Sequence, residues 1–235
     1  MKDPKSEIES LINAIIHGRL TPKEGWRAIK QLKDPYVERY SEQAWHQYIG
    51  NTFEEMVYKL ISGRISQLKQ GNLIPESVNV LSQSQVKMND VVYRKIAIRY
   101  NNYLILPDID ICFVDQDFAN PWNTSIIGIA SCKTSLRERI AQSCYWKLKF
   151  LSSDITKHIK VYLITTDNDN DFSISEKRKT HYNGKSRNRI ISEYELDGIY
   201  ILRDDFREEW ESEKVKRYDA LFDDLAKIFK KELSR

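Results

Sequence analysis

The stretch Ile126-Ile127-Gly128-Ile129-Ala130-Ser131-Cys132-Lys133 decides the fold of this chain. Its nearly continuous apolar run is typical of a strand buried in a sheet, and a lysine ends it. Upstream, Leu106-Pro107-Asp108-Ile109-Asp110 lies between two apolar strand segments. Pro107 must interrupt the strand ladder there, and Asp108 follows at the bend. The sequence therefore predicts two strands, one with a carboxylate at a bend and the next with a lysine at its end.

These two charged groups suit one kind of chemistry. Carboxylate oxygens are the ligands that Mg²⁺ prefers. The bound metal polarises a phosphate and lowers the pKa of an attacking water, while a nearby lysine stabilises or positions the nucleophile. Asp108 and Lys133 are therefore interpreted as the centre of a metal-assisted phosphodiester hydrolase. Taken singly, Pro-Asp is a common turn dipeptide and a lysine at a strand end is usually solvated, so the spacing alone leaves a structural role open.

A charged triplet, Arg137-Glu138-Arg139, opens the helix expected after this strand. Arginine near a helix N-terminus opposes the helix dipole, so stability alone does not favour two of them there. Arginine can donate to guanine O6 and N7, and glutamate can accept from cytosine N4, so the triplet could read a G·C pair. The alternative is an exposed helical turn with local ion pairs.

Pro107-Asp108 followed by Ser131-Cys132-Lys133 resembles the signature of the PD-(D/E)xK nuclease superfamily. The run from Cys132 to Gln142 is similar to the combined catalytic and recognition motif of CCGG-recognising, BsaWI-like type II restriction endonucleases. This resemblance implies Mg²⁺ as cofactor, catalysis by Asp108 and Lys133, and a metal shell that includes the carbonyl of Cys132. It also implies that Arg137, Glu138 and Arg139 read C·G pairs, and that cleavage leaves 3′-hydroxyl and 5′-phosphate ends.

The sequence departs from the family pattern at Ser131, where an Asp or Glu is usual. Some relatives supply that carboxylate about a dozen residues after the lysine, but residues 144–147 contain no acid. The resemblance points instead to Glu54, on a helix before the sheet and at the edge of its apolar face, as the second metal ligand and catalytic residue. Glu55 is the reserve candidate. Strand alternation puts Asp110 on the same side as Asp108, where it would assist or be solvated.

The apolar periodicity predicts helices before the sheet, including one that ends near His46, a break at residues 50–52, and a new helix capped by Thr52. Strands are expected over 91–100, 103–106, 109–114, 125–132, 160–165 and 199–202, with a helix after 132 and a C-terminal amphipathic helix from Val215. The predicted class is α/β: a restriction-endonuclease-like PD-(D/E)xK core, with a mixed β-sheet flanked by helices, behind a helical N-terminal region. The regions are residues 1–50, for dimerisation or DNA contact, and 51–235, the nuclease core.

Residues 177–189 carry the densest cluster of basic side chains and lack apolar periodicity, so they are expected to form a loop. Lysine and arginine on such a loop, with polar donors between them, suit contacts to DNA phosphates. We expect Lys177, Arg178, Lys185 and Arg187 to contact the DNA backbone. The alternative is a solvated surface loop.

The overall composition allows this function without proving it. The net charge is only +3, 41% of residues are hydrophobic and 30% are charged, which indicates a folded globular protein. No apolar run suits a membrane span or a secretory signal, and three cysteines without a CxxC pair exclude a complete disulfide framework, so a cytoplasmic location is expected.

The leading hypothesis is a Mg²⁺-dependent type II restriction endonuclease that cuts both strands of DNA at a palindrome containing CCGG or CC…GG. A two-fold target favours a homodimer, with the N-terminal helices or the C-terminal helix as interface, or a tetramer. The resemblance also implies a cognate DNA methyltransferase in the same system, without direct contact. The alternatives are a structure-specific or repair nuclease of the same fold, and a catalytically weak sequence-specific DNA-binding protein.

Overall fold

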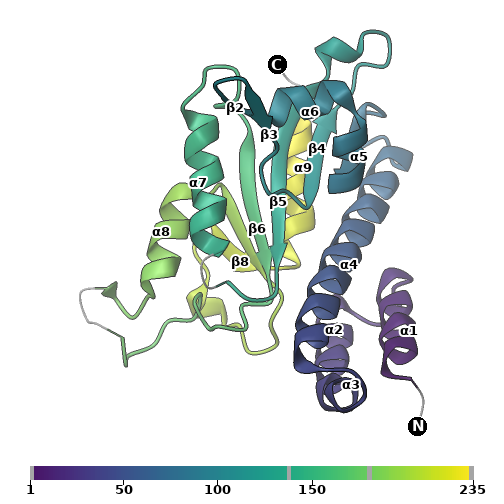
Figure 1. Ribbon diagram of the computed structural model, residues 1–235, viewed down its shortest axis with the longest axis vertical. Helices are drawn as coiled ribbons and strands as arrows, with labels where there is room; N and C mark the ends of the chain where they lie inside the picture. The colour runs from purple at the N-terminus through teal and green to yellow at the C-terminus, as the bar shows by residue number, and fades with distance from the viewer. Residues whose placement is uncertain (1–2, 137–138, 179–181, 233–235) are drawn as a thin grey trace.

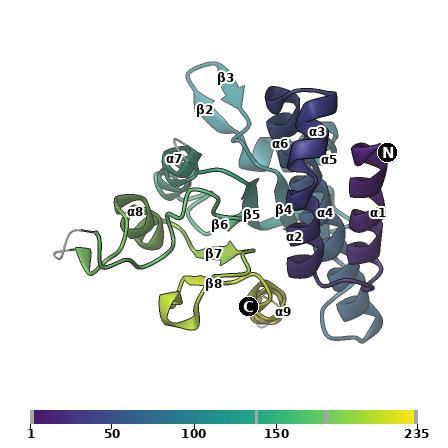
Figure 2. The ribbon, with the colours of Figure 1, turned by 90° about the horizontal axis from the view of Figure 1, so that it is seen from below.

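A computed structural model describes residues 3–136, 139–178 and 182–232. A central sheet separates two groups of helices (Figures 1 and 2). The long helix α4 and the C-terminal helix α9 pack on one side of the sheet, and α7 packs on the other. Helices α1 to α3 pack around the N-terminal half of α4 (Figure 1). None of the helices in the described ranges is long and apolar enough to cross a membrane.

The helices are α1 (Pro4–Ile16), α2 (Pro22–Gln31), α3 (Lys33–Arg39), α4 (Glu42–Gln70), α5 (Gln83–Met88), α6 (Asp90–Ile96), α7 (Arg139–Leu151), α8 (Arg187–Glu195) and α9 (Ala220–Glu232). The strands are β1 (Val78–Ser82), β2 (Ile98–Tyr100), β3 (Tyr103–Ile105), β4 (Ile111–Asp115), β5 (Ser125–Lys133), β6 (Lys160–Thr165), β7 (Gly198–Ile201) and β8 (Val215–Arg217). Short 3₁₀ turns lie at Pro121–Asn123 and Glu208–Trp210.

The main sheet has six strands in the order β1-β4-β5-β6-β7-β8, and β2 and β3 form a separate hairpin. Pairing is antiparallel from β1 to β5 and parallel from β5 to β8. The predicted mixed α/β architecture, flanked by helices and preceded by a helical N-terminal region, is therefore confirmed. Strand β5 lies near the middle of the sheet, as its apolar sequence predicts.

Alternating side chains of β5 enter two different apolar cores. Ile127, Ala130 and Cys132 pack on the side of α4 and α9, whereas Ile126 and Ile129 pack on the side of α7. All residues of β5 after Ser125 are buried. Because both faces of β5 are buried, its sequence does not alternate between apolar and polar residues before Ser131.

The predicted break at residues 50–52 is wrong, because α4 runs without interruption through Gly50 and Thr52. Ser41 caps the helix by accepting from the amide of Ala44 at 3.1 Å. The side chains of Ile49 and Phe53 are buried on either side of Gly50, and their burial outweighs the roughly 1 kcal/mol cost of glycine inside a helix. The helix predicted to end near His46 is correspondingly divided into α3 and the first turn of α4.

The division into residues 1–50 and 51–235 stays a prediction, although its boundary lies inside α4. Side chains of the N-terminal helices, such as Ile8 and Trp26, belong to the same apolar core as Phe113 of β4. The N-terminal helices therefore pack against α4 and share a core with the sheet.

Two further expectations are corrected in the middle of the chain. Residues 91–100 were expected to form one strand, but α6 occupies Asp90–Ile96 and only Ile98–Tyr100 is strand. Asn89 caps α6 by accepting from the amide of Val92 at 3.1 Å, and Val92 and Ile96, one turn apart, are both buried. Local capping and tertiary burial thus override the strand preference of the β-branched residues. The sequence also gave no signal for edge strand β1, where only Val78 is buried.

The C-terminal helix begins later than predicted. Val215 belongs to β8, and α9 starts at Ala220. The apolar side chains Tyr218, Leu225 and Phe229 are buried in the chain's own core. The apolar side chains of α9, which the sequence offered as a possible dimer interface, therefore pack inside the chain itself.

Candidate active site

Antiparallel pairing of β4 with β5 brings the two sequence motifs together. Ile111, the first residue of β4, pairs with Ala130, and the amide of Asp110 donates to the carbonyl of Ala130 at 3.1 Å. The residues just before β4 therefore lie beside the last residues of β5. The Ser131 hydroxyl donates to the carbonyl of Asp108 at 3.2 Å, so the position that departs from the family pattern helps to hold the bend.

Lys133 is the buried cation of the site, with only 7% of its surface exposed. Its Nζ lies 3.0 Å from Oδ2 of Asp110 and 3.4 Å from Oδ2 of Asp108. Burial disfavours the charged amine, but the carboxylates of Asp110 and Asp108 more than compensate and raise the pKa of Lys133. The side chain is therefore an ammonium at neutral pH, able to stabilise negative charge on a phosphate.

Asp110 is held more firmly than Asp108. Its Oδ2 accepts both from Nζ of Lys133 and from the backbone amide of Cys132, the latter at 2.6 Å. Burial raises the pKa of Asp110, while Lys133 and the Cys132 amide oppose that shift. Asp108 is partly exposed, with 35% of its side-chain surface open. Asp110, which sequence reasoning treated as an optional helper, is thus held by more contacts than Asp108 in this site.

Helix α4 brings Glu54 to the same site, as predicted. Glu54 is half-buried and lines a cavity of about 520 Å³ together with Lys133. The other lining residues are His46, Gln47, Gly50, Asn51, Cys132, Thr134, Ser135 and Arg139. Burial, reinforced by the negative charges of Asp110 and Asp108, raises the pKa of Glu54 to about 7, although Lys133 opposes the shift. Glu55, the reserve candidate, is exposed and pairs with Lys59 at 2.6 Å.

The donor set is suited to Mg²⁺ but contains few protein ligands. In the described ranges, no three Asp, Glu, His or Cys side chains form a group that could hold a metal ion. Asp108 and Asp110 nevertheless approach one Lys133 ammonium, and Glu54 lies within their electrostatic influence. Proteins usually hold Mg²⁺ through one or two carboxylates, water and substrate phosphates. Two aspartates with Glu54 nearby fit that pattern.

The loop after β6 holds the segment that follows Lys133 through three hydrogen bonds. Oδ2 of Asp169 accepts from Oγ of Ser135 at 2.8 Å and from the amide of Leu136 at 2.6 Å. Thr166 adds a hydrogen bond from its hydroxyl to the carbonyl of Thr134 at 3.0 Å. The chain between Lys133 and the charged triplet is therefore fixed by the loop that follows the neighbouring strand β6.

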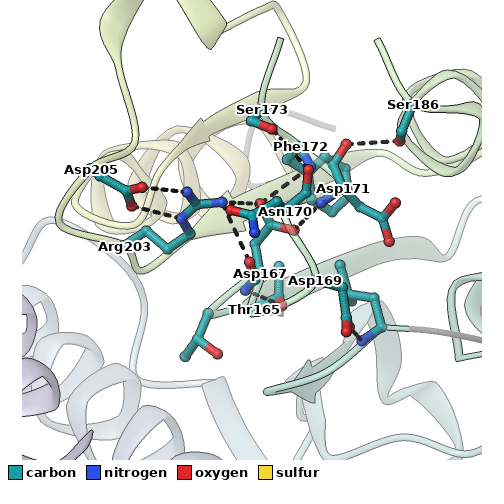
Figure 3. Close-up of polar contacts among 12 residues, drawn as sticks. Thr165, Asp167, Asp169, Asn170, Asp171, Phe172, Ser173, Ser186, Arg203 and Asp205 are labelled. Atoms are coloured by element: carbon teal, nitrogen blue, oxygen red, sulfur yellow. Dashed lines mark hydrogen bonds and ion pairs between the residues drawn. The ribbon is translucent and has the colours of Figure 1, made fainter. Parts of the chain in front are cut away.

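A buried ion pair holds that loop in turn (Figure 3). Asp167 has a positive φ of 48° and accepts from the amides of Asp171 and Phe172, which closes the loop on itself. Nη1 of Arg203 lies 2.7 Å from Oδ2 of Asp167, and the same guanidinium also binds Asp205. Burial raises the pKa of Asp167 to about 6, even though Arg203 and the two amides favour its charged form.

The triplet Arg137-Glu138-Arg139, predicted to read bases, is described only at its last residue. Arg137 and Glu138 lie outside the described residues. Arg139 is the first residue of α7, is exposed and lines the cavity beside Lys133. Cys132 also lines the cavity, although its side chain is buried.

The basic segment divides into exposed and internally bonded residues. Lys177 and Arg187 are exposed. Arg178 donates to the carbonyls of Asn170 and Ser173, so it also braces the loop after β6. Lys185 pairs with Glu193 at 2.7 Å. The expectation of a loop throughout 177–189 is wrong at its end, because Ser186 caps helix α8, which begins at Arg187.

Sequence reasoning missed the importance of Asp110 and the role of residues 166–173. The signal for Asp110 was present, since alternation placed it beside Asp108. The loop Asp167-Asn168-Asp169-Asn170-Asp171 was visible only as a polar turn. Its contacts to Ser135 and Arg203 join residues more than 30 positions apart, which no local pattern reveals.

Comparison with known proteins relates this chain to type II restriction enzymes. Residues 81–224 match the family model described as BsaWI restriction endonuclease type 2. The chain is 39% identical over 201 residues to the putative type II restriction enzyme MjaVIP of Methanocaldococcus jannaschii, covering 85% of this chain and 82% of that protein. It is 42% identical over 90 residues to the probable type II restriction enzyme HpyAORF263P of Helicobacter pylori, covering 38% of this chain and 44% of that protein.

A solved structure, the complex of restriction endonuclease PspGI with substrate DNA, aligns with 98% of this chain and 94% of its own, at 13% identity and a TM-score of 0.44. The family match spans β4, β5 and the aspartates and lysine at their ends, and the Methanocaldococcus relative extends the similarity to most of the chain. The chain belongs to the BsaWI family of type II restriction endonucleases, enzymes that cleave DNA at specific sites.

Proposed function

We propose that this restriction endonuclease cuts both strands of DNA at a palindromic site containing CCGG or CC…GG, by Mg²⁺-assisted hydrolysis in the α4–β5 cavity. The observation that carries the assignment of the site is the Lys133 ammonium, buried at the end of β5 between the carboxylates of Asp110 and Asp108. A buried lysine with two acidic partners, open to a cavity of about 520 Å³, has the charge to receive a phosphate diester together with a cation.

Each residue then has a distinct task. Asp110 and Asp108 would hold the cation together with the carbonyl of Cys132, and the carboxylate of Glu54 would lie nearby in the same cavity. Mg²⁺, when bound, supplies polarisation of the scissile phosphate and a lower pKa for the attacking water. Lys133 stabilises the charge that develops on the phosphate. A bound cation would favour the ionised form of Glu54, which lines the same cavity and could orient the water through its carboxylate oxygens.

Recognition is assigned to the triplet at the start of α7. Arg139 is exposed at the cavity, close in sequence to the catalytic Lys133. Arginine can bind guanine O6 and N7 through two hydrogen bonds, and glutamate can accept from cytosine N4. Arg137, Glu138 and Arg139 are therefore proposed to read the C·G pairs of the target.

Phosphate contacts outside the cavity are proposed for Lys177 and Arg187, which are exposed. Arg178 and Lys185 are weaker candidates for this task, because both already have partners within the protein. Their side chains would have to exchange those partners for phosphate.

A homodimer, or a tetramer built from dimers, would match the symmetry of a palindromic target. One catalytic site per chain serves one strand, so two copies are needed for a double-strand cut in one binding event. The N-terminal helices remain the proposed interface through their exposed faces, because the buried side chains of these helices and of α9 belong to the chain's own core. Light scattering with and without a target duplex measures the assembly, and a monomer that makes double-strand breaks in one binding event would contradict it.

Digestion of a sequenced plasmid with Mg²⁺, followed by mapping of the ends, tests the proposal. We expect discrete fragments whose ends map to CCGG-containing palindromes, with 3′-hydroxyl and 5′-phosphate termini. Asp110→Asn and Lys133→Met should each abolish cleavage while duplex binding remains, because few other groups can replace them. A smear of fragments would indicate a nuclease without sequence specificity, and near wild-type cleavage by either variant would show that the catalytic site lies elsewhere.

A further inference from the structure

One wall of the active-site cavity is a surface of α4 that the proposed chemistry does not use. Gln47, Gly50 and Asn51 line the cavity on the same side of the helix as Glu54, at spacings of three, four and seven residues. We refer to these three residues as the α4 cleft surface. It faces the cavity that also contains Lys133 and Arg139.

Gly50 has no structural reason to be glycine. It lies inside a 29-residue helix, away from both ends, where glycine costs about 1 kcal/mol relative to alanine. Among the described residues, the glycines with positive φ are Gly18 and Gly184, so Gly50 has ordinary helical geometry. A Cβ atom built on Gly50 would meet nothing within 4 Å in the described protein. The space that a side chain would occupy is therefore left open toward the cavity.

The two amides beside Gly50 are also available. In the part of the chain that the structure describes, the side chains of Gln47 and Asn51 are exposed and form no hydrogen bond with other residues. An amide side chain can donate two hydrogen bonds and carries no charge that would compete with the carboxylates of Asp108 and Asp110. The uncharged amide groups of Gln47 and Asn51 therefore lie beside Gly50, where the helix backbone has no side chain over it.

We infer that the α4 cleft surface is a contact site for the sugar–phosphate backbone of the strand being cut, with Gly50 at the point of closest approach. The inference rests on the proposed function, which puts the scissile phosphate between Lys133 and Glu54. At about 1.5 Å per residue, Gly50 and Gln47 lie roughly 6 and 10 Å along α4 from Glu54. Phosphates of one strand are spaced about 3.4 Å along the duplex axis, so nearby phosphates fall within reach of Gln47 and Asn51.

A backbone role is favoured over base reading. The surface adjoins Glu54, where the cleaved strand must present a phosphate rather than a base edge. Glycine lets another molecule approach the helix backbone closely but offers no side chain to read a base. This suits contact with the sugar–phosphate backbone, which is the same for every DNA sequence. Substitutions here should therefore affect cognate and random duplexes alike.

The experiment compares Gly50, which is half-buried, with Gly63, which is exposed, lies on the same helix and also has open space at its Cβ position, but does not line the active-site cavity. Alanine and leucine are introduced separately at each position in the full-length chain. Thermal melting is measured for all four variants. Binding is measured by fluorescence anisotropy on CCGG and scrambled duplexes in EDTA, and cleavage is measured on a plasmid with Mg²⁺.

Alanine at either position should raise the melting temperature by about 2 °C, because it improves helix propensity. Gly50→Leu should reduce cleavage by roughly 100-fold, the order expected when a substrate is displaced by about 1 Å, and should weaken both duplexes equally. Gly63→Leu should stay within about twofold of wild type in binding and cleavage. Asn51→Ala should weaken both duplexes to the same extent.

Wild-type levels of binding and cleavage in a folded Gly50→Leu protein would overturn the inference and leave the proposed function intact. Loss confined to the CCGG duplex in Asn51→Ala would overturn the backbone assignment in favour of base reading. If Gly50→Leu fails to fold, Gly50→Ala decides the question: higher stability with lower cleavage supports the contact, and higher stability with unchanged cleavage contradicts it. Failure of the wild-type protein itself to bind or cut DNA would instead refute the proposed function.

Discussion

Glu54→Gln should stabilise the metal-free protein at alkaline pH while it impairs cleavage. Glu54 is half-buried near two aspartates, and these surroundings raise its pKa from 4.5 to about 7. Between these two pH values the folded protein binds a proton that the unfolded chain has released. The free energy of unfolding therefore falls as the pH rises from 4.5 to 7. Above pH 7 this loss of stability is complete and no longer changes with pH.

Without any correction for solvent screening, this pKa difference would lower the free energy of unfolding by about 3 kcal/mol above pH 7. Solvent screens a half-buried carboxylate, so we expect a cost of about 1–2 kcal/mol. Glutamine has nearly the same shape and no charge. At pH 8 in EDTA, Glu54→Gln should therefore melt about 2–8 °C above wild type, whereas at pH 4.5 the difference should largely disappear.

Glu55→Gln is the matched control, because Glu55 is the next residue of α4 but is exposed and paired with Lys59. It should melt like wild type or slightly below at pH 8. Cleavage at pH 8 with Mg²⁺ should fall strongly in Glu54→Gln and little in Glu55→Gln. Equal melting temperatures for Glu54→Gln and wild type at both pH values would refute the reasoning, since Glu54 would then not be held against Asp110 and Asp108.

Three other variants test the supports of the site and its approach to DNA. Arg203→Met should lower the free energy of unfolding by about 3–5 kcal/mol in chemical denaturation, because it leaves buried Asp167 without its cation; a loss below about 1 kcal/mol would contradict this. Asp169→Ala should lower kcat with little change in melting temperature or in binding to random duplex, because it releases Ser135; Asp169→Asn, which keeps an acceptor oxygen, should recover part of the rate. Arg187→Ala should weaken binding to every duplex and reduce the slope of log K against log salt by about 1, and an effect limited to the CCGG duplex would instead indicate a base contact.

The central strand β5, the lysine at its end and the aspartate at the bend before β4 were predictable because their signals are local. Nearly unbroken apolar residues from Ile126 to Cys132 identify a strand buried on both faces, and they do so without knowledge of its neighbours. Pro107 and Lys133 are conspicuous for the same reason, since each breaks an apolar pattern. The amphipathic period around Phe53 likewise placed Glu54 at the edge of a buried helical face, where the structure puts it.

Local signals failed where tertiary packing outweighed propensity. Gly50 suggested the end of a helix, but buried side chains on both sides of it keep α4 continuous. Residues 91–96 carry β-branched side chains, yet an Asn89 cap and two buried contacts one turn apart make them helical. In both cases burial against neighbours that are distant in the sequence stabilises the helix, and in α6 the local Asn89 cap contributes as well.

The sequence by itself determined which residues had the chemistry for the site: an aspartate at a bend, a lysine at a strand end and a glutamate on a helix. Only the tertiary structure decided how they divide the work. Antiparallel pairing of β4 with β5 puts Asp110, rather than Asp108, against both Lys133 and the Cys132 amide. The physical reason is that a carboxylate binds a metal or a cation strongly only when it is buried and its partner lies about 3 Å away. Strand register and helix packing set that burial and that distance, whereas residue type does not.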